Sequence, residues 1–186
     1  NQGWSGSAPG LEFEVMEFYN CDFDMYQTLS DIPNGKYIVK LQGFYRTGGN
    51  DGGAAYQAGT ENISAELYAN QASMPLTSLY KYPASEMGVT NNQVLNDYVN
   101  MRVAVNEAFN LTHEAENAEG DIVTKGYYDD NELTVGVQDG TLKIGLRNSG
   151  HADASWCAFR DFKLIYYGNF PGLNLLALIQ DIQNYL

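Results

Sequence analysis

Basic residues are scarce in this chain. Ten lysines and arginines stand against 23 aspartates and glutamates, which gives a formal net charge of -13 at pH 7. Nucleic acids are bound through basic patches that neutralise phosphates, so this balance excludes a nucleic-acid partner. It also disfavours anionic membrane surfaces. Neutral sugars, cations and basic proteins remain open as partners.

Long apolar runs and cysteines are also lacking. No stretch approaches the roughly 20 apolar residues that cross a bilayer, so we expect no membrane insertion. No signal peptide is recognisable, and a start at Asn1 is what a mature or trimmed terminus gives. The two cysteines, Cys21 and Cys157, are too few for a disulfide framework. A bridge between them stays open, but we expect two free, half-buried thiols.

The usual arrangements of catalytic residues are missing. Ser5 follows no strand and does not fit a nucleophile elbow. The two histidines, His113 and His151, show no metal-ligand spacing and lie in polar, loop-like surroundings. Glycoside hydrolysis needs two opposed carboxylates, but a pair such as Asp129-Asp130 carries little information in so acidic a chain. We therefore expect a protein that is not an enzyme.

The residues that are abundant favour strands and turns. The chain has 186 residues, 44% of them apolar, which fits one domain with a full core. It contains 14 tyrosines and 19 glycines, and aromatic residues suit the pleated, half-buried surface of a sheet. Strands are predicted at Leu11–Phe18, Phe23–Leu29, Tyr37–Tyr45, Ser64–Tyr68, Met74–Tyr80, Glu132–Gln138, Thr141–Leu146 and Trp156–Tyr167.

Two dipeptides predict turns, and one internal segment predicts a helix. Asn34-Gly35 predicts a turn, and Asp139-Gly140 predicts a two-residue hairpin between its flanking strands. Apolar residues from Met101 to Phe109 have the spacing of an amphipathic helix, and the acidic stretch His113–Asp121 reads as a loop. Strands with one short crossing helix predict an all-β sandwich over residues 1–168.

The tail from 169 to 186 differs from the rest. Asn169–Gly172 is typical of a linker, and Asn174 can cap a helix with Leu175, Leu178, Ile179 and Ile182 on one face. This helical tail either packs on the sandwich or begins a following domain, and we favour the following domain.

Several segments together resemble a family of domains. They are Glu17–Asn20, Phe23–Leu29, Ile32–Tyr37, Gly43–Arg46, Asp139–Gly145 and Trp156–Gly168. Their order and spacing, over about residues 4 to 168, resemble the galactose-binding-like jelly-roll domains of exported, multimodular Bacteroidetes proteins. The last block in that family usually has Asp-Asn after its Phe, whereas Phe159 here is followed by Arg160 and Asp161.

The resemblance implies a fold, a setting and a class of function. The fold is a jelly-roll β-sandwich, a galactose-binding-like domain often attached to glycan-degrading enzymes or to surface proteins. The implied location is secreted, periplasmic or on the cell surface, and the neighbouring domains of a larger parent protein are expected partners. Fold carries over better than function, because related folds host different sites.

A sugar site needs flat aromatic faces and polar groups that fix hydroxyls. Candidates near strand ends and loops are Tyr45, Arg46, Tyr56, Asn148 and Trp156. Three of them have an alternative: Trp156 can be a core residue, Tyr45 can cover the sheet, and Arg46 can pair with a carboxylate. Exposed rings would favour a carbohydrate-binding-like module that takes a glycan. Buried rings would favour a structural or protein-interaction spacer without a small-molecule ligand.

Calcium is the only cofactor that the sequence suggests. The resemblance places a structural calcium between an early-strand Glu and a last-strand Asp, which correspond to Glu17 and Asp161. Hard cations need several oxygen ligands at once, and no dense loop of acidic residues supplies them here. The alternative, which we favour, is that Asp161 caps a turn or pairs with Arg160, Arg46 or Lys163.

Overall fold

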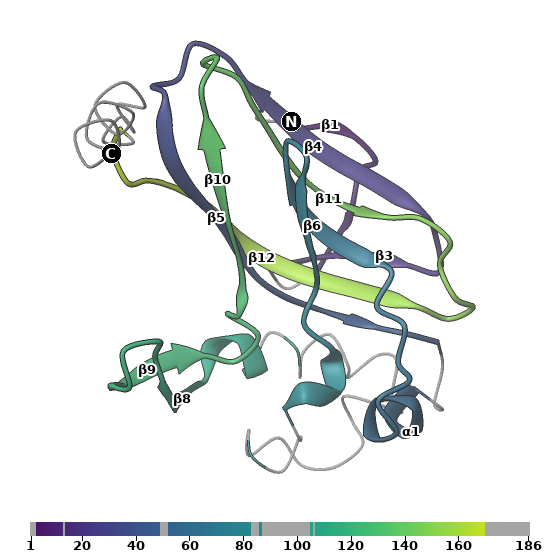
Figure 1. The fold of residues 1–186 in the computed structure, drawn as a ribbon. Coiled ribbons are helices and arrows are strands. Elements are labelled where there is room, and N and C mark those ends of the chain that lie inside the picture. The colour runs from purple at the N-terminus through teal and green to yellow at the C-terminus, as the bar shows by residue number, and fades with distance from the viewer. Residues whose placement is uncertain are drawn as a thin grey trace, which may run out of the picture.

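The computed structural model is a sandwich of two antiparallel sheets (Figure 1). It describes residues 3–12, 14–48, 52–82, 86, 105 and 107–169. The first sheet has the order β1-β4-β11-β6-β7 and the second has the order β10-β5-β12-β3-β2. The helical tail predicted from Asn174, with its linker, lies beyond the described residues.

The strands of the two sheets range in length from two residues in β1 to twelve in β5. The first sheet contains β1 (Ser5–Gly6), β4 (Phe23–Leu29), β6 (Ala65–Ala69), β7 (Ala72–Pro75) and β11 (Leu142–Asn148). The second sheet contains β2 (Gly10–Glu12), β3 (Val15–Tyr19), β5 (Gly35–Arg46), β10 (Asn131–Val137) and β12 (Trp156–Tyr166).

The connections between strands make this sandwich a jelly roll. From β3 to β6, and again from β7 through β10, β11 and β12, each named strand lies in the sheet opposite its predecessor. Only β6 and β7 form a hairpin within one of the two sheets among these strands. Such crossing is the double Greek key of a jelly roll, so the predicted all-β jelly-roll sandwich is confirmed.

The main core fills the space between the sheets. Alternate residues of each strand point inward, as the period-2 pattern of the sequence requires. The buried set includes Val39 and Leu41 of β5, Leu142 and Leu146 of β11, and Phe159 of β12. Phe18 and Phe23 stack with ring centroids 4.0 Å apart, which joins β3 to β4 across the layer.

A second apolar cluster covers the outer face of the second sheet. Its sheet residues, such as Phe44 and Trp156, alternate with inward-facing neighbours. Its covering residues come from the insert, which we define as the segment between β7 and β10. In its described part the insert holds the helical turn η1 (Leu79–Lys81), helical residues at 105 and 107–110, and the hairpin β8 (Thr112–Glu116) with β9 (Ile122–Gly126).

Three local predictions from the sequence are wrong. Asp139-Gly140 does form a turn, but the strands on its two sides do not pair with each other. β10 pairs with β5, whereas β11 pairs with β4 and β6, so the turn connects the two sheets and does not close a hairpin. The acidic stretch predicted as loop contains β8, which alternates exposed and half-buried residues. The strand predicted at Met74–Tyr80 ends at Pro75 and gives way to η1.

The cysteines are free thiols. Cys157 is buried in the main core and Cys21 is half-buried against it. Burial raises the pKa of the Cys157 thiol, and the neighbouring Cys21 adds to the effect. Within the described residues, no helix has the length and apolar character that crossing a membrane requires.

Candidate functional site

The predicted sugar-site residues gather at one end of the sandwich. We call this the loop end; it is formed by residues 20–22, the described parts of 47–64, and 149–155. Tyr45 is only 1% exposed and its hydroxyl hydrogen-bonds to Ser64 at 2.9 Å. Asn148 is 3% exposed and donates to that hydroxyl at 3.3 Å. These two side chains are therefore buried at the end of the main core and do not form an exposed surface.

Trp156 and Arg46 lie on the opposite side of the second sheet, under the insert. Trp156 is 2% exposed, and its indole N–H donates to Glu17 Oε2 at 2.8 Å. The Arg46 guanidinium lies 5.5 Å from the Trp156 ring centroid and donates to the Ala154 carbonyl at 3.0 Å. No ring face of Tyr45 or Trp156 is open to a ligand.

Tyr56 is the most accessible of the predicted residues. It lies on the short helix α1 (Gly52–Gln57), half-buried, with its ring centroid 6.4 Å from that of Tyr80. Glu61 adds a half-buried carboxylate here, and burial raises its pKa although Ser78 and the Thr47 amide donate to it. Tyr56 and Arg46 both lie near Tyr80, whereas Tyr45 packs in the main core and binds Asn148.

Glu17 and Asp161 each have a protein partner. The Glu17 carboxylate accepts the Trp156 indole N–H. Asp161 has a φ of 54° at a bulge in β12, and its carboxylate lies 3.9 Å from Arg160 Nε. Among the described residues, no group of three or more His, Cys, Asp or Glu side chains is placed to hold a metal ion. This arrangement matches the alternative in which Asp161 pairs with Arg160.

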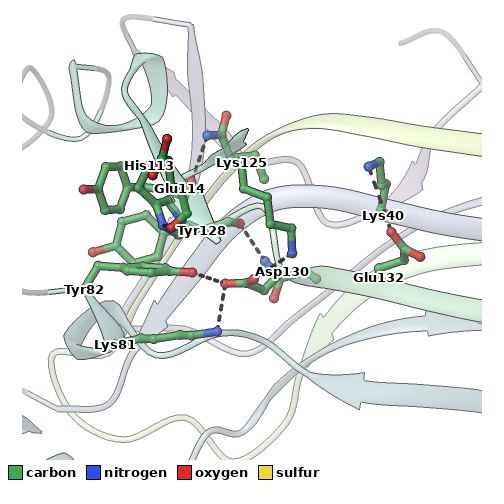
Figure 2. Close-up of polar contacts among 12 residues, drawn as sticks. Lys40, Lys81, Tyr82, His113, Glu114, Lys125, Tyr128, Asp130 and Glu132 are labelled. Carbon is green, nitrogen blue, oxygen red and sulfur yellow. Dashed lines mark hydrogen bonds and ion pairs between the residues drawn. The ribbon is translucent and has the colours of Figure 1, made fainter. Parts of the chain in front are cut away.

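A charged cluster joins separate parts of the insert to one another, next to the start of β10. Asp130 accepts hydrogen bonds from Lys81 at 2.9 Å, from Lys125 at 3.2 Å and from the Tyr82 hydroxyl (Figure 2). Burial alone would raise the pKa of Asp130, but hydrogen bonds from Tyr82 and Lys81 outweigh it and lower the pKa. The carboxylate is satisfied by three donors, so we assign this cluster to structure.

Buried amides hold the insert from below. The Gln42 side chain donates to the Phe109 and Tyr127 carbonyls, both at 2.9 Å, and accepts from Arg160. Asn131 is fully buried and donates to the Gly43 and Tyr128 carbonyls. Sequence analysis missed these residues, although a polar side chain inside an otherwise apolar strand is a signal that such a partner exists.

A groove opens at the opposite end of the sandwich. We call this the turn end; it is formed by the turns at 30–34, 70–71 and 138–141. The groove has a volume of about 590 Å³ and lies between the β6–β7 turn, β10 and the start of β11. Ala69 and Val135 are buried and form its deep part. The small side chains of Ala69 and Ala72 leave the space that larger residues would fill.

The rim of the groove is polar, and some of its polar groups make no hydrogen bond within the described protein. It contains Asn70, Gln71, Asp139, Thr141 and Lys143. Asn70 is committed to the fold, because its side chain binds the backbone of Thr141 and Lys143. Asp139 uses one carboxylate oxygen to accept from the Thr141 amide at 3.0 Å. Across the described residues, the Gln71 amide and the Thr141 hydroxyl make no hydrogen bond, so both are available to a ligand.

Sequence reasoning did not find the groove. Sequence analysis predicts nothing for Ala69–Ala72, and Asp139–Lys143 enters it as a turn, a strand and part of the family resemblance. The small residues at positions 69 and 72 were the available signal, but they predict a hollow only when β10 is known to lie opposite.

Comparisons with known proteins give one structural likeness. No protein-family model matches the chain, and no curated protein matches it. Among solved structures it is similar to TmCBM61 in complex with β-1,4-galactotriose, with 12% sequence identity and a TM-score of 0.40. The match covers 89% of this chain and 83% of the other. At this level the likeness decides nothing about function, which must be argued from the geometry.

Proposed function

We propose that this domain is a non-catalytic, carbohydrate-binding-like module of an exported protein, and that the groove at the turn end is its ligand site. The observation that carries the proposal is an open groove of about 590 Å³ with small apolar side chains in its depth and unused polar groups on its rim. This volume falls in the range of about 300–1,000 Å³ that is typical of ligand sites in proteins.

The rim chemistry suits the hydroxyl groups of a sugar. The Gln71 amide can both donate and accept, the Thr141 hydroxyl can do the same, and the second oxygen of Asp139 can accept. No aromatic ring is among the described lining residues, so the partly exposed methyl groups of Ala72 and Val135 are the apolar surface that a C–H face of the ring can contact. Among the described residues, Asp139 is the one carboxylate that lines the groove, whereas glycoside hydrolysis requires two. These features support binding without catalysis.

The test is a glycan array followed by calorimetry on selected oligosaccharides. The double variant Gln71→Ala, Thr141→Ala removes both unused polar groups and should lower the affinity at least about tenfold, which corresponds to 1.4 kcal/mol. Tyr56→Ala, at the loop end, is the matched comparison and should leave the affinity unchanged. Loss of binding in Tyr56→Ala alone would move the site to the loop end.

A structural or protein-interaction spacer is the second candidate. It is favoured by the burial of Tyr45 and Trp156, whose rings would otherwise have formed a platform for sugars. A spacer has no small-molecule ligand, so silence of the wild-type protein across a broad glycan array would favour it. The next experiment would then be to compare the unfolding of this domain alone and beside its neighbours in the parent protein.

A further inference from the structure

Within the part of the chain that the structure describes, Lys143 is the one cationic side chain that lines the proposed groove, and its ammonium group contacts residues outside the groove. Its Nζ lies 3.8 Å from the centroid of the Tyr26 ring, 5.5 Å from that of Tyr68 and 4.0 Å from Asp24 Oδ2. Tyr26 and Asp24 belong to β4, on the far side of β11 from the β6–β7 turn. The Lys143 ammonium group thus lies over the outer face of the first sheet.

The residues that hold Lys143 are themselves fixed. The Tyr68 hydroxyl donates to Asp24 Oδ1 at 2.7 Å, and the Tyr68 ring lies directly over Gly145. On the same face, Arg147 makes two hydrogen bonds to Glu66 Oε2, at 3.0 and 2.8 Å. Side chains that are already held in one geometry lose less conformational freedom when a ligand arrives.

Two charged side chains line the described part of the groove. They are Lys143, whose ammonium group contacts Tyr26 and Asp24, and Asp139, whose carboxylate is exposed. The whole chain carries a formal charge of -13, so the long-range field also repels anions. A uronate or sulfate group entering the groove would meet Asp139 without the compensating ammonium. An uncharged sugar needs no such compensation.

We infer that Asp24 and Tyr26 make the groove selective for uncharged glycans, by holding the Lys143 ammonium away from it. This inference rests on the proposed function and deepens it by naming the class of ligand. Asp24 and Tyr26 are positioning residues, because they act on the ligand only through Lys143. The selectivity is therefore adjustable from outside the groove.

The experiment compares a neutral oligosaccharide with a uronic-acid oligosaccharide of equal length by calorimetry. The double variant Asp24→Asn, Tyr26→Leu keeps an acceptor for the Tyr68 hydroxyl but removes the charge and the ring that hold Lys143. The ratio of acidic to neutral affinity should rise about tenfold, the effect of 1.4 kcal/mol. Adding Lys143→Met to this variant should return the ratio to its original value.

Glu66→Gln is the matched control. It releases Arg147, another cation of the same face, which does not line the groove. The ratio should not change in this variant. An equal gain in Glu66→Gln would mean that any added positive charge is sufficient, and would overturn the role of Lys143.

A measurement without ligand tests the positioning directly. Ring currents of Tyr26 should shift the NMR signals of the Lys143 ε-methylene upfield from those of the other lysines, and Tyr26→Leu should remove that shift. Neutral binding with an unchanged ratio in the double variant overturns this inference alone. Failure of the wild type to bind any oligosaccharide overturns the proposed function, and this inference with it.

Discussion

At the residue scale, Gly145 sits where two neighbouring strands leave no room for a side chain. A Cβ at this position would lie 2.6 Å from the Met25 carbonyl oxygen and 2.6 Å from Cζ of Tyr68. Gly145→Ala should therefore lower the free energy of unfolding by about 1–3 kcal/mol, the usual cost of overpacking. Urea unfolding would measure it, with Ser73→Ala on an exposed edge position as the control. An unchanged midpoint would mean that Tyr68 can move aside freely.

Asp130 should make stability depend on pH. Its pKa in the folded protein is lowered, so its contribution is present above the unfolded pKa of about 3.9 and is lost as the pH falls through the folded value. Asp130→Asn should lower the free energy of unfolding at pH 7 by about 1–3 kcal/mol, as for hydrogen bonds to a charged group. The difference between the two proteins should shrink in thermal melts from pH 5 to pH 2. A constant difference would contradict the assignment.

The predicted sugar residues show what sequence cannot reveal at this scale. The alternation along β5 places Tyr45 and Arg46 on opposite faces, and the sequence pattern alone is enough to predict this. It does not say which face another segment covers. Arg46 and Trp156 are buried because the insert packs over the outer face, and that contact joins residues far apart in the chain. The sequence around an aromatic residue at a strand end is the same whether another segment covers that face or leaves it exposed.

At the scale of elements, the insert depends on a few buried polar contacts with the second sheet. Gln42→Ala would leave the Tyr127 carbonyl without its side-chain donor and would leave the Phe109 carbonyl with Arg160 alone. Faster amide hydrogen exchange is expected at 107–110 and 126–128, with β4 and β11 unchanged, because the main core lies on the other side of the sheet. Lys40→Ala, on the same strand and half-buried, is the control. Equal acceleration in β4 and β11 would mean that insert and sandwich open together.

The turn at Asp139-Gly140 explains why a strong local signal gave a wrong pairing. Gly140 has a φ of 71°, as the dipeptide predicts. The same turn can close a hairpin or carry the chain from one sheet to the other. The choice is made by β5 and by β4 with β6, which bind β10 and β11 respectively. These partners are distant in sequence, so no local pattern contains them.

At the scale of the whole molecule, the order and alternation of strands were enough to predict the sandwich, and the resemblance supplied the jelly roll. The groove was beyond reach for a physical reason. Its walls come from the β6–β7 turn and from β10, which belong to different sheets and are separated by the whole insert. A groove of this kind exists only where the two elements lie at a suitable distance from each other. Small residues in one of them therefore predict a groove only after that distance is known.

The net charge of -13 sets how the whole molecule should respond to ions. Self-repulsion destabilises a compact anionic chain, and salt screens it. Raising NaCl from 10 to 500 mM should therefore increase the free energy of unfolding. Each 1 kcal/mol of that increase should raise the melting temperature by roughly 2–4 °C. Calcium at equal ionic strength should add nothing further, because Glu17 already accepts the Trp156 indole N–H and Asp161 pairs with Arg160.

A bound calcium would need about six to eight oxygen ligands around one point, and the response would then differ in kind. Calcium would stabilise by mass action, so the melting temperature would keep rising with calcium concentration at fixed ionic strength. A chelator would reverse the gain, and magnesium would not reproduce it because it demands a tighter octahedral site. Scanning calorimetry with matched NaCl, magnesium and calcium separates the two cases. A rise specific to calcium would restore Glu17 and Asp161 as ligands, and a response common to all three salts would leave them as partners of Trp156 and Arg160.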